Sequence, residues 1–325
     1  MTLTDPTPTD KPQTLRRVFY GPSELRAGWR LLIFVAIVAA FFIPVNLIAR
    51  HFIAGGPQAI KELTWKILVI ADSTTFLIVM IATFVMSKIE GRKMGVYGLP
   101  LRSAFGRNFW LGVVWGFSAI TLLLGILWLC HDFDFGTFAL RGPQLLQYAF
   151  LWGVSFVLVG LSEEYMIRGY GQFTLTLGIG FWPAAILWSL FFAFQHSSNS
   201  GEAWLGLAQV ALIALFFCFT LNRTGTLWFA VGFHAAWDWG QTFFYGTPDS
   251  GLLGRGHLLN SSSHGSTWMT GGSVGPEGSV LSVVLILLLT VLFHFAFKKG
   301  EPYPDPTALK EKPEEPALFP IRTMA

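Results

Sequence analysis

Long apolar stretches recur along most of this chain and restrict its fold more than any other feature. A helix that crosses a bilayer needs about 20 predominantly apolar residues. We expect eight such spans, at residues 31–49, 67–87, 109–130, 146–174, 182–197, 204–221, 227–244 and 280–297. The fourth stretch is longer than a single span requires, and we expect it to be one overlong helix.

The composition agrees with a membrane protein. Of the 325 residues, 53% are hydrophobic and only 13% are charged, whereas a soluble domain carries about 25% charged residues. The net charge of +3 is small and gives no indication of a nucleic-acid partner. Cys130 and Cys218 both lie in apolar stretches, so we expect small buried side chains rather than a disulfide framework or a zinc ribbon. We therefore predict an all-α polytopic membrane protein.

Basic residues are distributed unevenly between the two sides of these spans. Polar tails at 1–30 and 298–325 flank a membrane domain at 31–297, which includes a Gly- and Ser-rich loop at 245–279. With both termini in the cytoplasm, most lysine and arginine residues fall on the cytoplasmic side, as the positive-inside rule requires. The exceptions are Arg50, Lys61, Lys66, Arg141 and Arg255. This bias predicts a cell-membrane protein with cytoplasmic termini and an outer 245–279 loop. The proline-rich C-terminal tail is expected to be disordered.

Two adjacent carboxylates interrupt the fourth stretch. Glu163 and Glu164 lie in an otherwise apolar segment, with Arg168 one helical turn later. Ionisable groups at bilayer depth are costly, so they indicate a functional site by default. The spacing, with the acid first, favours an ion pair between Glu164 and Arg168. Glu163 lies about 100° away around the helix, and a carboxylate that can take up a proton is what a general base requires.

Two later stretches carry further ionisable side chains. His196 lies near the end of the fifth stretch, and His234 and Asp238 are one helical turn apart in the seventh. At the rise of an α-helix, Glu163, His196 and His234 all lie roughly 14–22 Å from the same face of the membrane. The sequence therefore predicts an intramembrane cavity in which these side chains meet. A structural polar network without chemistry remains the alternative for each motif.

Several other hydrolytic chemistries lack their motifs. Ser162 is followed by Glu163 and does not complete a Gly-x-Ser-x-Gly elbow, and the chain has no His-Glu-x-x-His zinc motif. The other intramembrane acid, Asp72, is near Lys66, and we expect an interfacial pair of these two side chains rather than a catalytic group.

Three motifs resemble those of the CPBP family, which comprises the CAAX endopeptidases and the bacteriocin-processing or immunity proteins of the Abi group. The motifs are Glu163-Glu164-x-x-x-Arg168, Phe192-x-x-x-His196 and His234-x-x-x-Asp238, within residues 109–244. The resemblance implies an eight-helix intramembrane endopeptidase with a buried site. It also implies that Glu163 activates water with help from His196, and that His234 with Asp238 stabilises the oxyanion. We expect the pair of Glu164 and Arg168 to anchor the helix.

Asp238 departs from the family pattern, in which asparagine is usual at this position. An amide donates to an oxyanion and an ionised carboxylate does not. Asp238 must therefore be protonated, orient His234 or ligate a metal. The resemblance implies either a metalloprotease or a protease with glutamate-activated water, and the spacing leaves both open. If zinc is used, the candidate ligands are Glu163, His196, His234 and Asp238.

The function that we expect is hydrolysis of a peptide bond in a lipidated or membrane-embedded protein or peptide. Its partners would be membrane lipid and a prenylated or bacteriocin-like substrate. Two other functions fit the same residues: a non-enzymatic immunity or peptide-sequestering protein, and a proton-coupled carrier with a carboxylate–histidine relay. The sequence shows no visible internal repeat, which argues against the carrier.

Overall fold

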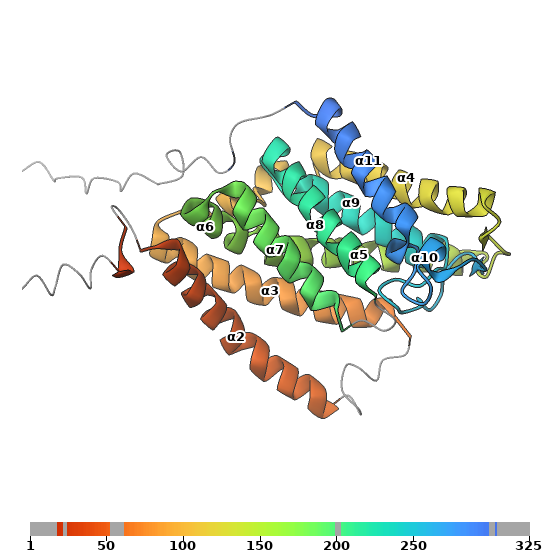
Figure 1. Cartoon of the computed structure of the whole chain (residues 1–325). Coiled ribbons are helices and arrows are strands. Elements are labelled where there is room, and N and C mark those ends of the chain that lie inside the picture. The colour runs from red at the N-terminus through yellow and green to blue at the C-terminus, as the bar shows by residue number, and fades with distance from the viewer. Residues whose placement is uncertain (1–17, 22–24, 53–61, 199–202, 299–302, 304–325) are drawn as a thin grey trace, which may run out of the picture.

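The computed structural model describes residues 18–21, 25–52, 62–198, 203–298 and 303 (Figure 1). The described part is a bundle of tilted helices with short connections. The longer elements are α2 (Ala27–Phe52), α3 (Trp65–Glu90), α4 (Arg107–Leu129), α5 (Pro143–Arg168), α6 (Tyr170–Ile179), α7 (Phe181–His196), α8 (Trp204–Thr224), α9 (Trp228–Asp238) and α11 (Val280–Ala296). The short elements are the 3₁₀ turns η2 (Met94–Tyr97), η3 (Leu101–Ser103) and η5 (Pro276–Gly278), the π-helical turn η4 (Trp239–Phe244), the helix α10 (Thr267–Thr270), and the strands β1 (Phe133–Asp134) and β2 (Ser262–Ser263).

Each predicted apolar stretch is helical in the structure. Five segments of the described chain are long and apolar enough to cross a membrane, and they comprise α2, α3, α4, α5 continued by α6, and α8. The helices α7, α9 and α11 occupy the other predicted stretches but are shorter. The prediction of an all-α polytopic membrane protein is confirmed. The predicted disordered tail from residue 298 onward lies almost wholly outside the described residues, as do the first 17 residues of the predicted N-terminal tail.

The fourth stretch is two helices rather than one overlong helix. α5 ends at Arg168 and α6 begins at Tyr170, because Gly169 between them adopts ψ −119°, which is not helical. A Cβ atom at Gly169 would lie 2.3 Å from the carbonyl oxygen of Tyr165, so only glycine fits this break. The stretch therefore consists of α5 followed, after the break at Gly169, by the shorter helix α6.

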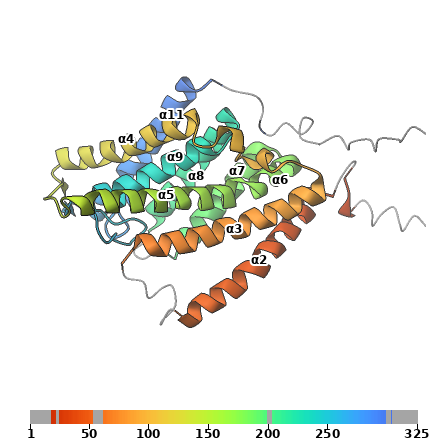
Figure 2. The same cartoon turned by 180° about the vertical axis from the view of Figure 1, so that it is seen from behind.

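The helices α4 and α9 pack backbone against backbone. Figure 2 shows α4 and α5 on the side of the bundle opposite to the view of Figure 1, with α9 between them and α8. A Cβ atom at Gly112 or Gly232 would lie 2.1 Å from a carbonyl oxygen of the other helix. Small residues let membrane helices approach in this way. This contact fixes α9, which carries two of the predicted site residues.

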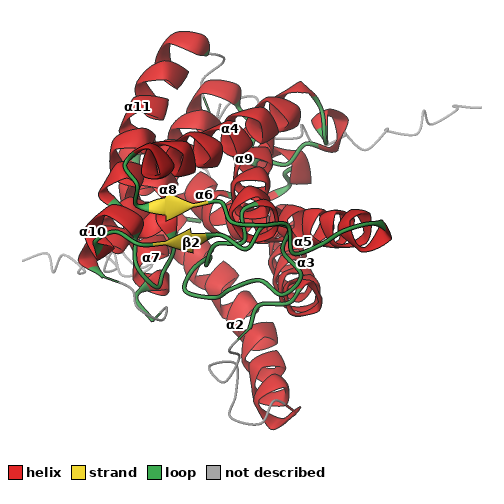
Figure 3. Cartoon of the chain, turned by 90° about the vertical axis from the view of Figure 1, so that its right-hand side faces the viewer, coloured by secondary structure: helices red, strands yellow, loops and turns green. Residues whose placement is uncertain are grey.

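The 245–279 loop folds across one end of the bundle (Figure 3). The short strand β2 in this loop pairs antiparallel with β1, which follows α4. Leu63, before α3, donates to the carbonyl oxygen of Leu253 at 3.1 Å and accepts from the N–H of Arg255 at 2.9 Å. The loop is therefore attached to the ends of two separate helices.

The two cysteines have different environments. Cys218 is buried in α8, as expected. Cys130 is exposed, and the prediction that it is buried is wrong, because it follows the last residue of α4 instead of lying in the packed part of that helix.

Candidate active site

A buried ion pair fixes one of the two adjacent glutamates. Oε2 of Glu164 lies 2.8 Å from Nη1 of Arg168, and both side chains are fully buried. Nε of Arg168 donates to the carbonyl oxygen of Ala214 at 3.3 Å, and its guanidinium lies over the rings of Phe192 and Phe217. The ion pair predicted from the spacing is present, and it ties α5 to α7 and α8.

His234 is held by the same glutamate. Its Nδ1 donates to Oε1 of Glu164 at 3.0 Å, and its ring stacks on Phe217. Its Nε2 lies 3.4 Å from Oδ2 of Asp238 and 3.7 Å from Oε2 of Glu163. From the sequence, Asp238 was a candidate to orient His234, and Glu164 was expected only in the ion pair with Arg168. In the structure Glu164 makes the orienting contact, because α9 packs beside α5.

Glu163 has a different environment from its neighbour. Its side chain is 28% exposed, whereas that of Glu164 is 0% exposed. The predicted difference of about 100° in direction around the helix accounts for this contrast. Glu164 points into protein, and Glu163 points into a cavity.

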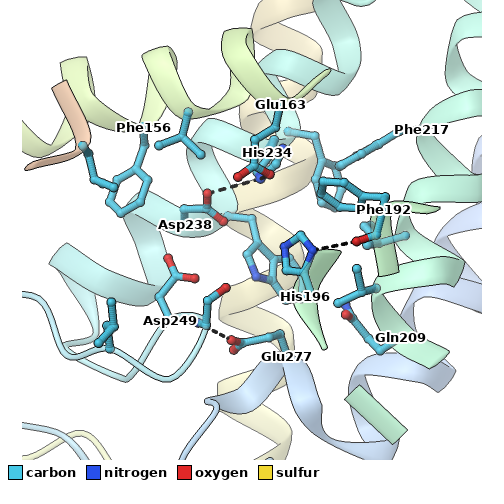
Figure 4. Close-up of a pocket in the computed structure, with 18 of the residues that line it drawn as sticks. Phe156, Glu163, Phe192, His196, Gln209, Phe217, His234, Asp238, Asp249 and Glu277 are labelled. Carbon is cyan, nitrogen blue, oxygen red and sulfur yellow. Dashed lines mark hydrogen bonds and ion pairs between the residues drawn. The ribbon is translucent and has the colours of Figure 1, made fainter. Parts of the chain in front are cut away.

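The cavity has a volume of about 270 Å³ and brings together Glu163, His196, His234 and Asp238. Figure 4 shows His196 pointing into it from α7. Its Nδ1 donates to the carbonyl oxygen of Phe192 at 2.9 Å, which leaves Nε2 to accept a hydrogen bond. The rest of the wall is mostly apolar, with side chains from α3, α5, α8 and α9.

The 245–279 loop supplies part of the cavity wall, which the sequence analysis missed. Asp249, Ser250, Leu252 and Glu277 all line the cavity. The only signal in the sequence was the presence of acids in a Gly- and Ser-rich loop. Such acids normally face water, so this signal could not place them in the site.

The two loop acids are buried and hydrogen-bonded. Oδ2 of Asp249 accepts from Oγ1 of Thr242 at 2.9 Å. Glu277 accepts from the N–H of Ser250 at 2.8 Å and from the side-chain amide of Gln241. Burial raises the pKa of Asp249 to about 6 and raises the pKa of Glu277 well above its usual range.

Asp72 contacts α5 rather than forming the predicted pair with Lys66. Its Oδ1 accepts from Oγ of Ser162 at 2.5 Å, while the ammonium of Lys66 lies over the ring of Trp65. The prediction was wrong because α3 packs against α5 along this face, which brings the hydroxyl of Ser162 to Asp72. Asp72 therefore contacts Ser162, the residue that precedes the cavity-facing Glu163 in α5.

The predicted zinc ligands line one cavity, but their arrangement is not that of a zinc site. Within the described residues, no group of three or more His, Cys, Asp or Glu side chains is arranged to hold a metal ion. Nδ1 of His234 is engaged by Glu164, and Nδ1 of His196 by a backbone carbonyl. The two Nε2 atoms remain, and that of His234 already lies between two carboxylates. The donors as arranged here do not fit a zinc site.

Comparison with protein families gives a match within the membrane domain. The model of the type II CAAX prenyl endopeptidase Rce1-like family matches residues 145–240, from α5 to the turn after α9. This segment contains every site residue predicted from the sequence. No curated protein matches the chain significantly. The match confirms the resemblance to CAAX-type intramembrane proteases over these residues, which make up less than a third of the chain.

Proposed function

We propose that the protein is an intramembrane endopeptidase that hydrolyses a peptide bond of a lipidated or membrane-embedded substrate by direct attack of water. Glu163 is the base that deprotonates this water, and the reaction forms no acyl-enzyme. The observation that carries the proposal is the contrast between the two adjacent glutamates. One is locked to Arg168 and His234, and the other faces an apolar cavity large enough for part of a peptide.

The histidines have separate roles in this proposal. His196 accepts a hydrogen bond from the attacking water through its free Nε2. His234, fixed by Glu164 through Nδ1, donates from Nε2 to the developing oxyanion. Asp238 lies 3.4 Å from the same nitrogen and favours a proton there. No step requires a metal.

The surroundings of the cavity support a substrate that arrives in the membrane. Its wall is mostly apolar and is formed by helices that expose large hydrophobic side chains on their outer faces. With both termini in the cytoplasm of a cell-membrane protein, the cavity lies toward the outer side, because the 245–279 loop covers it. The substrates that fit this chemistry are prenylated or bacteriocin-like peptides.

Turnover by the full-length protein in liposomes tests this function. The probe is an internally quenched peptide with a farnesylated cysteine three residues before its C-terminus. We expect cleavage by the wild-type protein, unaffected by a zinc chelator, and none by Glu163→Gln. Binding of the peptide without cleavage would instead support a sequestering protein. Uptake that depends on a pH gradient would support a carrier.

A further inference from the structure

Peptide hydrolysis requires two proton transfers. A base removes a proton from water, and an acid supplies one to the departing nitrogen, because an amide nitrogen does not leave readily as an anion. In the proposed function, on which this inference rests, Glu163 is the base. His234 is directed at carboxylates through both ring nitrogens and serves the oxyanion. The acid remains to be identified.

Asp249 is placed to be this acid. It lines the cavity that holds Glu163 and His196, and it comes from the loop rather than from the helices. Figure 4 shows its carboxyl group pointing into the cavity near Asp238. The hydroxyl of Thr242 donates to Oδ2 at 2.9 Å, and the Asp249 N–H donates to the carbonyl oxygen of Leu252 at 2.9 Å. The side chain is thus held in place while its carboxyl group faces the cavity.

The surroundings of Asp249 favour its protonated form. No lysine or arginine is found among the described residues that line the cavity. Burial raises the pKa of Asp249 to about 6. The hydrogen bond from Thr242 and the charge of His234 act against this rise, and the charge of Glu163 adds to it, so burial decides the direction. A carboxyl group that keeps its proton to about pH 6 meets the requirement for a general acid near neutral pH.

We propose that Asp249 is the general acid, donating its proton to the nitrogen of the scissile bond. As the C–O bond forms, Glu163 takes one proton from water. As the C–N bond breaks, Asp249 gives its proton to the nitrogen, and the products are a carboxylic acid and an amine. Glu163 is then protonated and Asp249 ionised, and one proton passes from Glu163 to Asp249 through water to restore the starting state.

The leaving group provides a test of this assignment. Two quenched farnesylated peptides are compared, one with a scissile amide and the other with a thioester at the same position. A thiolate leaves without protonation, since a thiol has a pKa of about 8.5. We expect Asp249→Asn to lower kcat for the amide by about 10²–10⁴-fold and to leave kcat for the thioester nearly unchanged. Thermal unfolding of the variant checks that it is folded.

Matched variants separate this inference from the proposed function. Asp134→Asn changes a 69% exposed aspartate near the same loop and should leave both substrates unaffected. Glu163→Gln should lose activity on both substrates, because hydrolysis of each needs the activated water. Equal losses on both substrates for Asp249→Asn, or no loss on the amide, would overturn the general-acid role while leaving the base intact. A wild-type protein that cleaves neither substrate would overturn the proposed function and this inference with it.

The pH profile gives a second readout. For the wild-type protein, kcat for the amide should fall above about pH 6, where Asp249 loses its proton, while kcat for the thioester should not fall there. A shared descending limb for the two substrates would contradict the proposal. The ionisable groups that face Asp249 are Glu163 from α5, His196 from α7, His234 and Asp238 from α9, and Glu277 from the loop.

Discussion

At the scale of single residues, Glu163 is the group on which activity should depend most directly. We expect Glu163→Gln to abolish peptide hydrolysis, since an amide cannot take a proton from water at neutral pH. Its side chain is 28% exposed and its nearest ion-pair atom is 3.7 Å away, so the melting temperature should stay close to that of the wild type. Turnover and thermal unfolding of the purified variant measure both quantities. Retention of wild-type turnover would show that another group activates the water.

Glu164 should behave in the opposite way. Glu164→Gln leaves Arg168 buried with a weakened partner, and removing one member of a buried pair costs about 3–5 kcal/mol. We expect a lower melting temperature and poor expression. The exposed Glu62→Gln is the matched control and should have no effect. An unchanged melting temperature for Glu164→Gln would mean that the ion pair does not support the fold.

Asp238→Asn tests the departure from the family pattern. The orienting contact to His234 comes from Glu164, so it survives this change. An asparagine oxygen can occupy the position beside Nε2, and its amide can donate to an oxyanion. We therefore expect Asp238→Asn to keep much of the activity, with or without a chelator. A loss of activity that added zinc restores would contradict the metal-free mechanism.

The sequence could identify the site residues that lie on helices but not those on the loop. Glu163, His196 and His234 stand out because each is ionisable within an apolar stretch, where such groups are costly. Asp249 and Glu277 lie in a polar loop, where acids are ordinary. Their burial results from the folding of that loop over the bundle, which depends on contacts distant in sequence.

At the scale of elements, the glycine contact between α4 and α9 should control both stability and activity. Gly232 lies two residues before His234, and a Cβ atom there would lie 2.1 Å from the carbonyl oxygen of Phe109. Overpacking of this kind costs about 1–3 kcal/mol. We expect Gly232→Ala to lower the melting temperature and to reduce turnover by displacing His234.

The control for this prediction lies on α4 itself. A Cβ atom at Gly125 would meet nothing within 4 Å, so Gly125→Ala should be neutral or slightly stabilising, because alanine favours a helix. Thermal unfolding and peptide turnover compare the two variants. Equal behaviour of the two variants would mean that the close approach of the helices is not required.

The apolar stretches predicted where the helices lie but not where they change direction. The break at Gly169 and the π-helical turn at Trp239–Phe244 both fall inside continuous apolar stretches. Hydrophobicity is insensitive to such local changes, since the residues on both sides remain apolar. At Gly169 the change is set by the local backbone, because its conformation leaves a Cβ atom 2.3 Å from the carbonyl oxygen of Tyr165 in the preceding turn.

At the scale of the whole molecule, orientation in the membrane can be tested by cysteine labelling. From the distribution of basic residues, we expect an impermeant maleimide to label Ser262→Cys in intact cells and not Arg102→Cys. Both positions are exposed in the structure. The exposed Cys130 is first replaced by serine to remove its own signal. Labelling of the Arg102→Cys variant alone would show that the orientation is opposite to the predicted one.

The attachment of the 245–279 loop to Leu63 and to β1 also bears on how substrate is encountered. A cover tied at two places restricts entry from the aqueous side, so a lipid-anchored peptide would arrive by diffusing within the bilayer. The rate would then depend on the number of substrate molecules per lipid molecule in the bilayer. It would not depend on the number of substrate molecules per litre of solution. At a fixed amount of enzyme and substrate, dilution with inert lipid should slow turnover, whereas dilution with buffer should not.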